Sequence, residues 1–252
     1  MFATLLRKEM REQRLTFRLW ILIGVLVVSG MISPLLAKYT PLLLSAIPGV
    51  PPQLAAIIPA PTILDSFIQY IKNVTQFGVI VVIVLTMGVM AQEVERGTAA
   101  MLLTKPVSRG AVILAKWAAG SIAILIAVAL AALGFAFYTL VLFEPFSLTN
   151  FLVLNSLIIV FLVFYLSLAL LASSLARTQA IAAAIAFGGL VLVLIVDALP
   201  VIGDNLPGQL MTWAGSLFTS NPHPAWPALA TCLVIIALFL GIAIFRFSRQ
   251  EI

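Results

Sequence analysis

Long runs of apolar residues alternate with short polar segments along this 252-residue chain. About 20 apolar residues are enough for a helix to cross a hydrocarbon core of about 30 Å. Six runs approach or exceed this length, and we expect membrane-spanning helices at roughly Leu19–Ala37, Gln76–Met90, Val112–Phe143, Phe151–Leu175, Ala180–Leu199 and Ala228–Phe245. The pattern therefore predicts an all-α integral membrane protein.

Two of the six runs depart from the usual length. The second is short, and we expect its helix to begin near Phe67, with Lys72 reaching the membrane interface. The third covers 32 residues, which corresponds to about 48 Å of helix. This helix must therefore tilt, bend near Gly134 or protrude from the bilayer.

The composition agrees with a membrane location. The chain is 63% hydrophobic and 9% charged, with a mean hydropathy of +1.19, which lies outside the range of soluble domains. The first apolar run is too long for a cleavable signal peptide. The net charge of +5 comes from basic residues that flank the apolar runs, so it indicates membrane topology and not nucleic-acid binding.

The basic residues also predict the orientation. With the N-terminus in the cytoplasm, all of the 14 Lys and Arg residues except Lys38 and Lys72 fall on the cytoplasmic side. Such a bias is typical of cytoplasmic segments. We therefore expect a multi-pass protein of the inner or cytoplasmic membrane, with both termini and segments 92–110 and 176–179 in the cytoplasm.

Residues 1–18 have an amphipathic pattern with helical period. One face carries a basic stripe formed by Arg7, Arg11, Arg14 and Arg18, and the opposite face carries Phe2, Leu6, Met10 and Phe17. A helix of this kind lies in the membrane interface with its bases toward anionic headgroups. It is either a simple orientation anchor or an elbow helix that also touches a cytoplasmic partner.

The outer segments 39–69 and 200–227 are rich in Pro, Gly and apolar residues. Trp213 and Trp226 suit the headgroup zone. Two interpretations remain open for these segments. They form short interfacial or re-entrant pieces, or they are ordinary loops that lie against the membrane.

Several kinds of site are excluded or disfavoured by the sequence. It contains no G-x-x-x-x-G-K-[ST] motif, so no Walker-type nucleotide site is expected. His223 is the only histidine, which leaves neither a His-pair zinc site nor a Ser–His pair at membrane depth. Ionisable residues are scarce within the spans, which disfavours ion-coupled transport. A pathway lined by Ser, Thr, aromatic and aliphatic groups suits an amphipathic or lipid-like substrate.

The first cytoplasmic segment, QEVERGTAAMLLTKPVSRGAVILAK, concentrates two acids and four bases between apolar runs. Gly97 can end the second span, and Thr98 can be the N-cap of a short new helix. Pro106 then breaks the chain, and Ser108 can cap the third span. The apolar residues between these breaks either dock on a soluble partner or fold back onto the membrane in a plain polar turn.

This segment resembles the E-x-x-x-G-T-x-x-x-L-L-x-x-P-x-S-R-x-x-x-x-x-x-K pattern of ABC-2 type permeases. The matching positions are Glu93, Gly97, Thr98, Leu102, Leu103, Pro106, Ser108, Arg109 and Lys116. The opening LLRKEMREQ, the turn SSLARTQA, the NP before the last span and the six spans are also similar to the family. The resemblance extends over essentially the whole chain, so residues 1–252 are expected to form a single ABC-2 transmembrane domain.

The resemblance implies the membrane subunit of an ATP-binding-cassette exporter, which is not itself an enzyme. Two copies of the chain would form a homodimer, and two ABC ATPase subunits would bind ATP and Mg, so no cofactor is expected in this chain. Arg96–Lys105 would be the main coupling element and Ala176–Gln179 the second. The implied coupling residues are Glu93, Glu95, Arg96, Gly97, Thr98, Met101, Leu102, Leu103, Pro106, Ser108, Arg109 and Arg177.

The expected function is therefore export of an amphipathic or hydrophobic substrate, and an antimicrobial or cytolytic peptide is the first candidate. Export of a lipid or a hydrophobic antibiotic is the alternative. A membrane-embedded enzyme is a different class, but it needs a polar catalytic cluster at membrane depth that the sequence does not show. A scaffold membrane protein is the third class.

Overall fold

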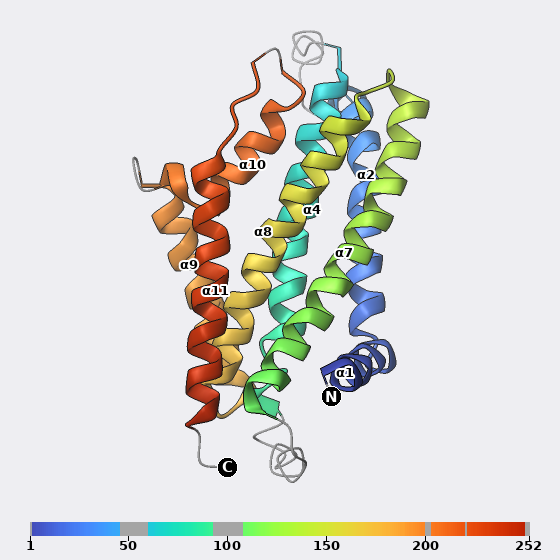
Figure 1. The fold of residues 1–252 in the computed structure, drawn as a ribbon. Coiled ribbons are helices and arrows are strands. Elements are labelled where there is room, and N and C mark those ends of the chain that lie inside the picture. Colours follow the sequence, from blue (N-terminus) through green and yellow to red (C-terminus); the bar gives the residue numbers. More distant parts are fainter. Residues whose placement is uncertain (1, 46–59, 93–107, 200–202, 220, 250–252) are drawn as a thin grey trace.

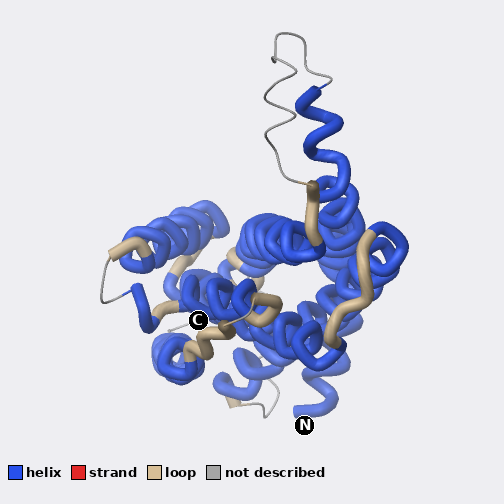
Figure 2. The backbone as a smooth tube through the Cα atoms, turned by 90° about the horizontal axis from the view of Figure 1, so that it is seen from above, coloured by secondary structure: helices blue, strands red, loops and turns tan. Residues whose placement is uncertain are grey.

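The computed structural model describes residues 2–45, 60–92, 108–199, 203–219 and 221–249. Their ordered elements are all helical, without a strand in these ranges (Figure 2). The elements are α1 (Phe2–Leu15), α2 (Arg18–Ser45), α4 (Ile63–Thr86), α7 (Arg109–Leu142), α8 (Leu148–Leu175), α9 (Gln179–Asp197), η1 (Gly203–Asn205), α10 (Pro207–Ser216) and α11 (Trp226–Ser248). Six of them are long and apolar enough to cross a membrane: α2, α4, α7, α8, α9 and α11. The predictions of an all-α chain and of six spans are confirmed.

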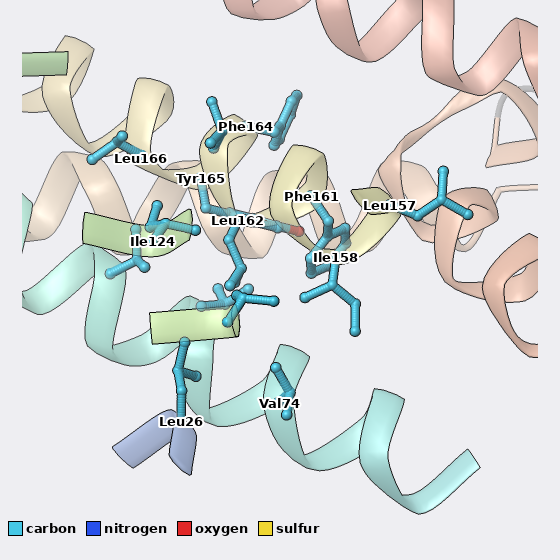
Figure 3. Close-up of a cluster of buried hydrophobic side chains, with 14 of the residues drawn as sticks. Leu26, Val74, Ile124, Leu157, Ile158, Phe161, Leu162, Phe164, Tyr165 and Leu166 are labelled. Atoms are coloured by element: carbon cyan, nitrogen blue, oxygen red, sulfur yellow. The ribbon is translucent and has the colours of Figure 1, made fainter. Parts of the chain in front are cut away.

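Helix α8 lies at the centre of the bundle. It is the most buried of the six spans, and it contacts α4, α7, α9, α10 and α11. Leu26 of α2, Val74 of α4 and Ile124 of α7 point toward the α8 side chains around Leu162 (Figure 3). Helix α9 is the least buried span and lies at the edge of the bundle (Figure 1).

Helix α4 begins earlier and ends earlier than the sequence pattern predicts. It begins after a capping box, in which Thr62 and Asp65 each accept a hydrogen bond from the other's backbone N–H. It ends at Thr86, and the Ser173 hydroxyl then accepts the N–H groups of Met90 and Ala91 at 2.9 and 3.2 Å. Because these N–H groups are bonded to α8, the helix does not continue to Met90.

Helices α2 and α7 cross at close range through small residues. A Cβ atom added at Gly30 would lie 2.5 Å from the carbonyl oxygen of Ala131. One added at Gly134 would lie 2.8 Å from Cγ of Met31. Helix α7 has 34 residues and continues without a break through Gly134, so this glycine serves the crossing with α2 and does not interrupt the helix.

Segments 39–69 and 200–227, which are rich in Pro, Gly and apolar residues, contain more helix than expected. Helix α2 extends to Ser45 and α4 starts at Ile63, so the connection between them is shorter than residues 39–69. Residues 200–227 contain η1 and α10. Trp213 is buried, and its ring centroid lies 4.9 Å from that of the exposed Trp226. The protein itself covers the Trp213 ring, whereas Trp226 is exposed; the predicted headgroup position of the two side chains stays a prediction.

Helix α1 lies across the ends of α2 and α7 (Figure 1). The chain turns at Phe17, whose φ of 58° lies in the left-handed region, and Arg18 is already the first residue of α2. A single helix through residue 18 is therefore wrong. The other three residues of the predicted basic stripe are exposed on α1, namely Arg7, Arg11 and Arg14.

Candidate functional site at the basic end of the bundle

Helix α1, the start of α7 and the last turn of α11 lie at the same end of the bundle, which we call the basic end (Figure 1). The elements that meet there carry most of the described basic residues: Arg7, Lys8, Arg11, Arg14, Arg18, Arg109, Lys116, Arg177, Arg246 and Arg249. Lys38, in contrast, lies 5.2 Å from the ring of Phe143, which follows the opposite end of α7. The fold therefore separates Lys38 from the basic residues that are predicted to lie in the cytoplasm.

A pair of glutamines joins the two predicted coupling segments next to the bundle, at the start of the first segment and at the end of the second. Nε2 of Gln92 donates to Oε1 of Gln179 at 2.7 Å. Nη2 of Arg18 donates to Oε1 of Gln92 at 3.3 Å. Gln92 is the last described residue before the first segment, and Gln179 is the first residue of α9. The hydrogen bonds place the base of both segments and the start of α2 in contact.

The returning end of the first segment is fixed to the C-terminal helix. The Ser108 hydroxyl accepts the N–H of Ala111 at 3.3 Å, which confirms the predicted cap of the third span. Nη1 of Arg109 donates to the carbonyl oxygens of Phe247 and Ser248, both at 3.1 Å. Since the last carbonyl groups of a helix have no partners within it, Arg109 satisfies the end of α11.

The remaining predicted coupling residues divide into two groups. Arg177 is described, and its side chain is exposed between α8 and α9. The following residue, Thr178, caps α9 by accepting the N–H of Ile181 at 3.4 Å. The others lie outside the described residues: Glu93, Glu95, Arg96, Gly97, Thr98, Met101, Leu102, Leu103 and Pro106.

A buried ion pair that the sequence analysis did not anticipate joins α1 to α7. Nζ of Lys116 lies 3.0 Å from Oε2 of Glu9, and the two side chains are 2% and 7% exposed. Lys8 contacts the other oxygen of Glu9 at 3.1 Å. Buried charges are strongly destabilising unless they are paired, so the pair explains how a lysine lies two turns inside an apolar helix. A cation in such a position was the signal for a buried partner.

The described part of the chain shows no metal-binding cluster. No group of three or more His, Cys, Asp or Glu side chains in these ranges is placed to hold a metal ion. Apart from Glu9 and Lys116, the buried polar side chains are uncharged: Ser29, Ser33, Ser66, Asn73, Thr139, Asn155, Ser167, Ser173 and Ser174. These groups bond to one another, to backbone or to neighbouring polar side chains, as in the hydrogen bond of 2.8 Å that Tyr70 donates to Asn155. This chemistry is that of helix packing.

Comparison with known proteins gives a family match over nearly the whole chain. The family model described as ABC-2 family transporter protein matches residues 3–252. The chain belongs to the ABC-2 transporter family. It is also 25% identical, over 98% of its own length and 97% of the other chain, to the uncharacterized transmembrane protein YxlG of Bacillus subtilis (strain 168). ABC-2 membership makes this a membrane transport component and implies partner ATPase subunits, as the resemblance of segment 92–116 predicted.

Proposed function

We propose that this chain is the permease half of an ATP-driven exporter. Two copies form the pathway, and two separate ABC ATPase subunits bind ATP and Mg. The observation that carries the proposal is the ABC-2 match over residues 3–252 in a chain whose sequence contains no Walker A motif. Since such transport needs nucleotide hydrolysis, we assign the nucleotide site to partner ABC ATPase subunits.

The proposed surface for the ATPase consists of segment 92–110, with segment 176–179 as a second contact. The hydrogen bond between Gln92 and Gln179 supports this assignment, because it holds the bases of the two segments together. The bonds from Arg109 to the end of α11 support it as well, because they connect the first segment to a second span. A displacement of either segment would then move several spans together.

We assign the basic end to the cytoplasm. The support is the accumulation of Lys and Arg there, which is typical of cytoplasmic segments. In this orientation both termini are cytoplasmic, and α1 lies in the inner interface as an elbow helix. Its exposed arginines, Arg7, Arg11 and Arg14, would contact anionic headgroups.

An amphipathic peptide is the substrate that we propose. The buried polar groups of the spans are uncharged hydroxyls and amides, apart from Lys116, whose partner Glu9 belongs to α1. These groups include Ser33, which accepts a hydrogen bond of 3.0 Å from Asn73 between α2 and α4. Apart from Lys116, the buried side chains of the spans thus carry no charge, which disfavours a small ion as the substrate.

Reconstitution tests this function. The chain is co-expressed with ABC ATPase subunits, placed in proteoliposomes and given a panel of fluorescent amphipathic peptides. We expect ATP-dependent transport of at least one peptide, and loss of that transport with the variants Glu93→Lys, Arg96→Glu and Leu102→Asp. Insertion of the variants should persist, because the proposal places these positions outside the bilayer. The same transport in these variants as in the parent would exclude segment 92–110 as the coupling element.

A further inference from the structure

The hydrogen-bond ladder of α4 is interrupted just before the first proposed coupling segment. In a continuous helix, the N–H groups of Met90 and Ala91 would each donate to the carbonyl oxygen four residues earlier. The carbonyl oxygen of Thr86 instead accepts the N–H of Val89 at 3.0 Å, and residues 87–90 form a turn. The first coupling segment is therefore not a direct continuation of the α4 helix.

A single hydroxyl group on α8 replaces the two missing acceptors. Oγ of Ser173 accepts the N–H of Met90 at 2.9 Å and that of Ala91 at 3.2 Å. Ser173 is almost fully buried, so water does not compete for these bonds. A serine oxygen can accept two hydrogen bonds, and a buried N–H group without an acceptor is costly. The two bonds therefore attach the turn to α8.

The side chains next to these bonds are buried against several spans. Met90 packs in one cluster with Ile113 of α7, Leu170 of α8 and the end of α11. Ala91 packs with Ala176, the first residue of the second coupling segment. The start of the first segment thus lies against three spans and against the second segment.

Both proposed coupling segments meet at the last turn of α8. Ser173 lies in this turn, α8 ends at Leu175, and the second segment begins at the next residue, Ala176. Helix α8 is the most buried span and contacts α4, α7, α9, α10 and α11. A displacement of this turn would therefore be passed to most of the bundle.

We infer that Ser173 is a positioning residue for coupling, a role that rests on the proposed function of segment 92–110. Its hydroxyl group holds the start of that segment on α8, so a displacement of the segment moves α8 with it. Without the hydroxyl group, the turn loses two bonds to α8 and takes up part of the displacement itself. ATP hydrolysis then continues, but less substrate is moved for each ATP.

Two measurements on the full chain test this role. Amide hydrogen exchange, without ATPase subunits, monitors the N–H groups of Met90 and Ala91. Proteoliposomes with ABC ATPase subunits and a fluorescent amphipathic peptide give the transport per ATP hydrolysed. For Ser173→Ala we expect about tenfold faster exchange of both amides, which corresponds to about 1.4 kcal/mol. We expect transport per ATP to fall by about threefold or more, as for the loss of one link between coupled sites.

The same helix offers a matched control. Ser167 is fully buried on α8, and its hydroxyl group accepts a hydrogen bond of 2.9 Å from Nε1 of Trp117 on α7. Ser167→Ala therefore removes a bond between α8 and another span, but not one to a coupling segment. It should change neither the exchange of Met90 and Ala91 nor the transport per ATP. Ser173→Thr keeps the hydroxyl group and should keep both values close to those of the parent.

Only variants that elute as folded protein and melt within a few degrees of the parent are compared. If Ser173→Ala fails that criterion, Ser173→Cys replaces it, because sulfur is a weak acceptor. Unchanged exchange or unchanged transport per ATP in the folded variant would overturn the inference while the proposed function stands. An equal loss of transport per ATP in Ser167→Ala would overturn it as well. A parent without ATP-dependent transport would reject the proposed function, and the role of Ser173 with it.

Discussion

The Lys116 ammonium group and the Glu9 carboxylate form a contact of 3.0 Å between α7 and α1, and both side chains are almost fully buried. These residues are 107 positions apart in the sequence. The pair fixes the docking of an amphipathic surface helix onto a membrane-spanning helix. Both side chains also line a small cavity between α1 and the bundle.

Replacing one member of this pair should be more harmful than replacing both. Lys116→Met or Glu9→Leu leaves a buried charge without its main partner, and we expect each to lower the free energy of unfolding by about 3–5 kcal/mol. The double variant should lose less than either single variant, because no buried charge remains. Unfolding in detergent micelles measures this, with Lys72→Met as an exposed control. Losses that simply add in the double variant would show that the pair is not coupled.

The crossing of α2 and α7 predicts opposite effects for two glycines of α2. Gly30→Ala places Cβ against the Ala131 carbonyl, and we expect it to lower the free energy of unfolding by about 1–3 kcal/mol. Gly24→Ala meets nothing within 4 Å, and we expect a neutral or stabilising effect of up to about 1 kcal/mol. Thermal unfolding in micelles compares the two. Equal effects of the two substitutions would argue against the close crossing.

Asp197 should hold α10 in place. Its Oδ1 accepts the N–H of Gly208 in the first turn of α10 at 3.2 Å. Asp197→Ala removes this acceptor, and we expect amide hydrogen exchange in α10 to become about tenfold faster, which corresponds to about 1.4 kcal/mol. Glu144→Ala, at an exposed position, should not change it. Unaltered exchange in the Asp197→Ala protein would mean that packing alone holds α10.

The glutamine pair should matter for coupling and less for stability. Gln92→Ala and Gln179→Ala each remove the hydrogen bond between the bases of the two segments, and we expect each to lower the amount of substrate transported per ATP hydrolysed. The double variant should be about as impaired as the more affected single variant, because both substitutions remove the same contact. Asn221→Ala is the control, because this exposed residue precedes α11 at the far end from the glutamines. Losses of transport per ATP that add up in the double variant would mean that the two segments do not act through this contact.

The positions of the helices were predictable where local chemistry determines them. The apolar runs predicted all six spans, and Ser108 was correctly expected to cap α7. The capping box Thr62-x-x-Asp65 is a sequence signal for the start of α4. The expected start near Phe67 missed this signal. The turn at Phe17 had no such signal, because a left-handed conformation is uncommon for a bulky residue.

The site was less predictable, because its contacts join distant parts of the chain. Lys116 was noted only as a match to the permease pattern, and its pairing with Glu9 depends on how α1 docks against α7. The contact between Gln92 and Gln179 depends likewise on how α4 and α9 are placed around α8. The burial of Trp213 depends on how α10 packs, which the residue type alone did not indicate. Local patterns identify elements, but tertiary packing decides which side chains meet.

Segment 92–110 is proposed to receive mechanical work from an ABC ATPase, and site-specific cross-linking measures its contact with that partner. In a Cys232→Ala background, a photoactivatable maleimide is attached to Leu102→Cys or, as the control, to Asn221→Cys. The protein is then irradiated in membranes that contain co-expressed ABC ATPase subunits. We predict an ATPase adduct from position 102, with a yield that changes when ATP is added, and none from position 221. An ATPase adduct from position 221, or none from position 102, would show that segment 92–110 is not the coupling element.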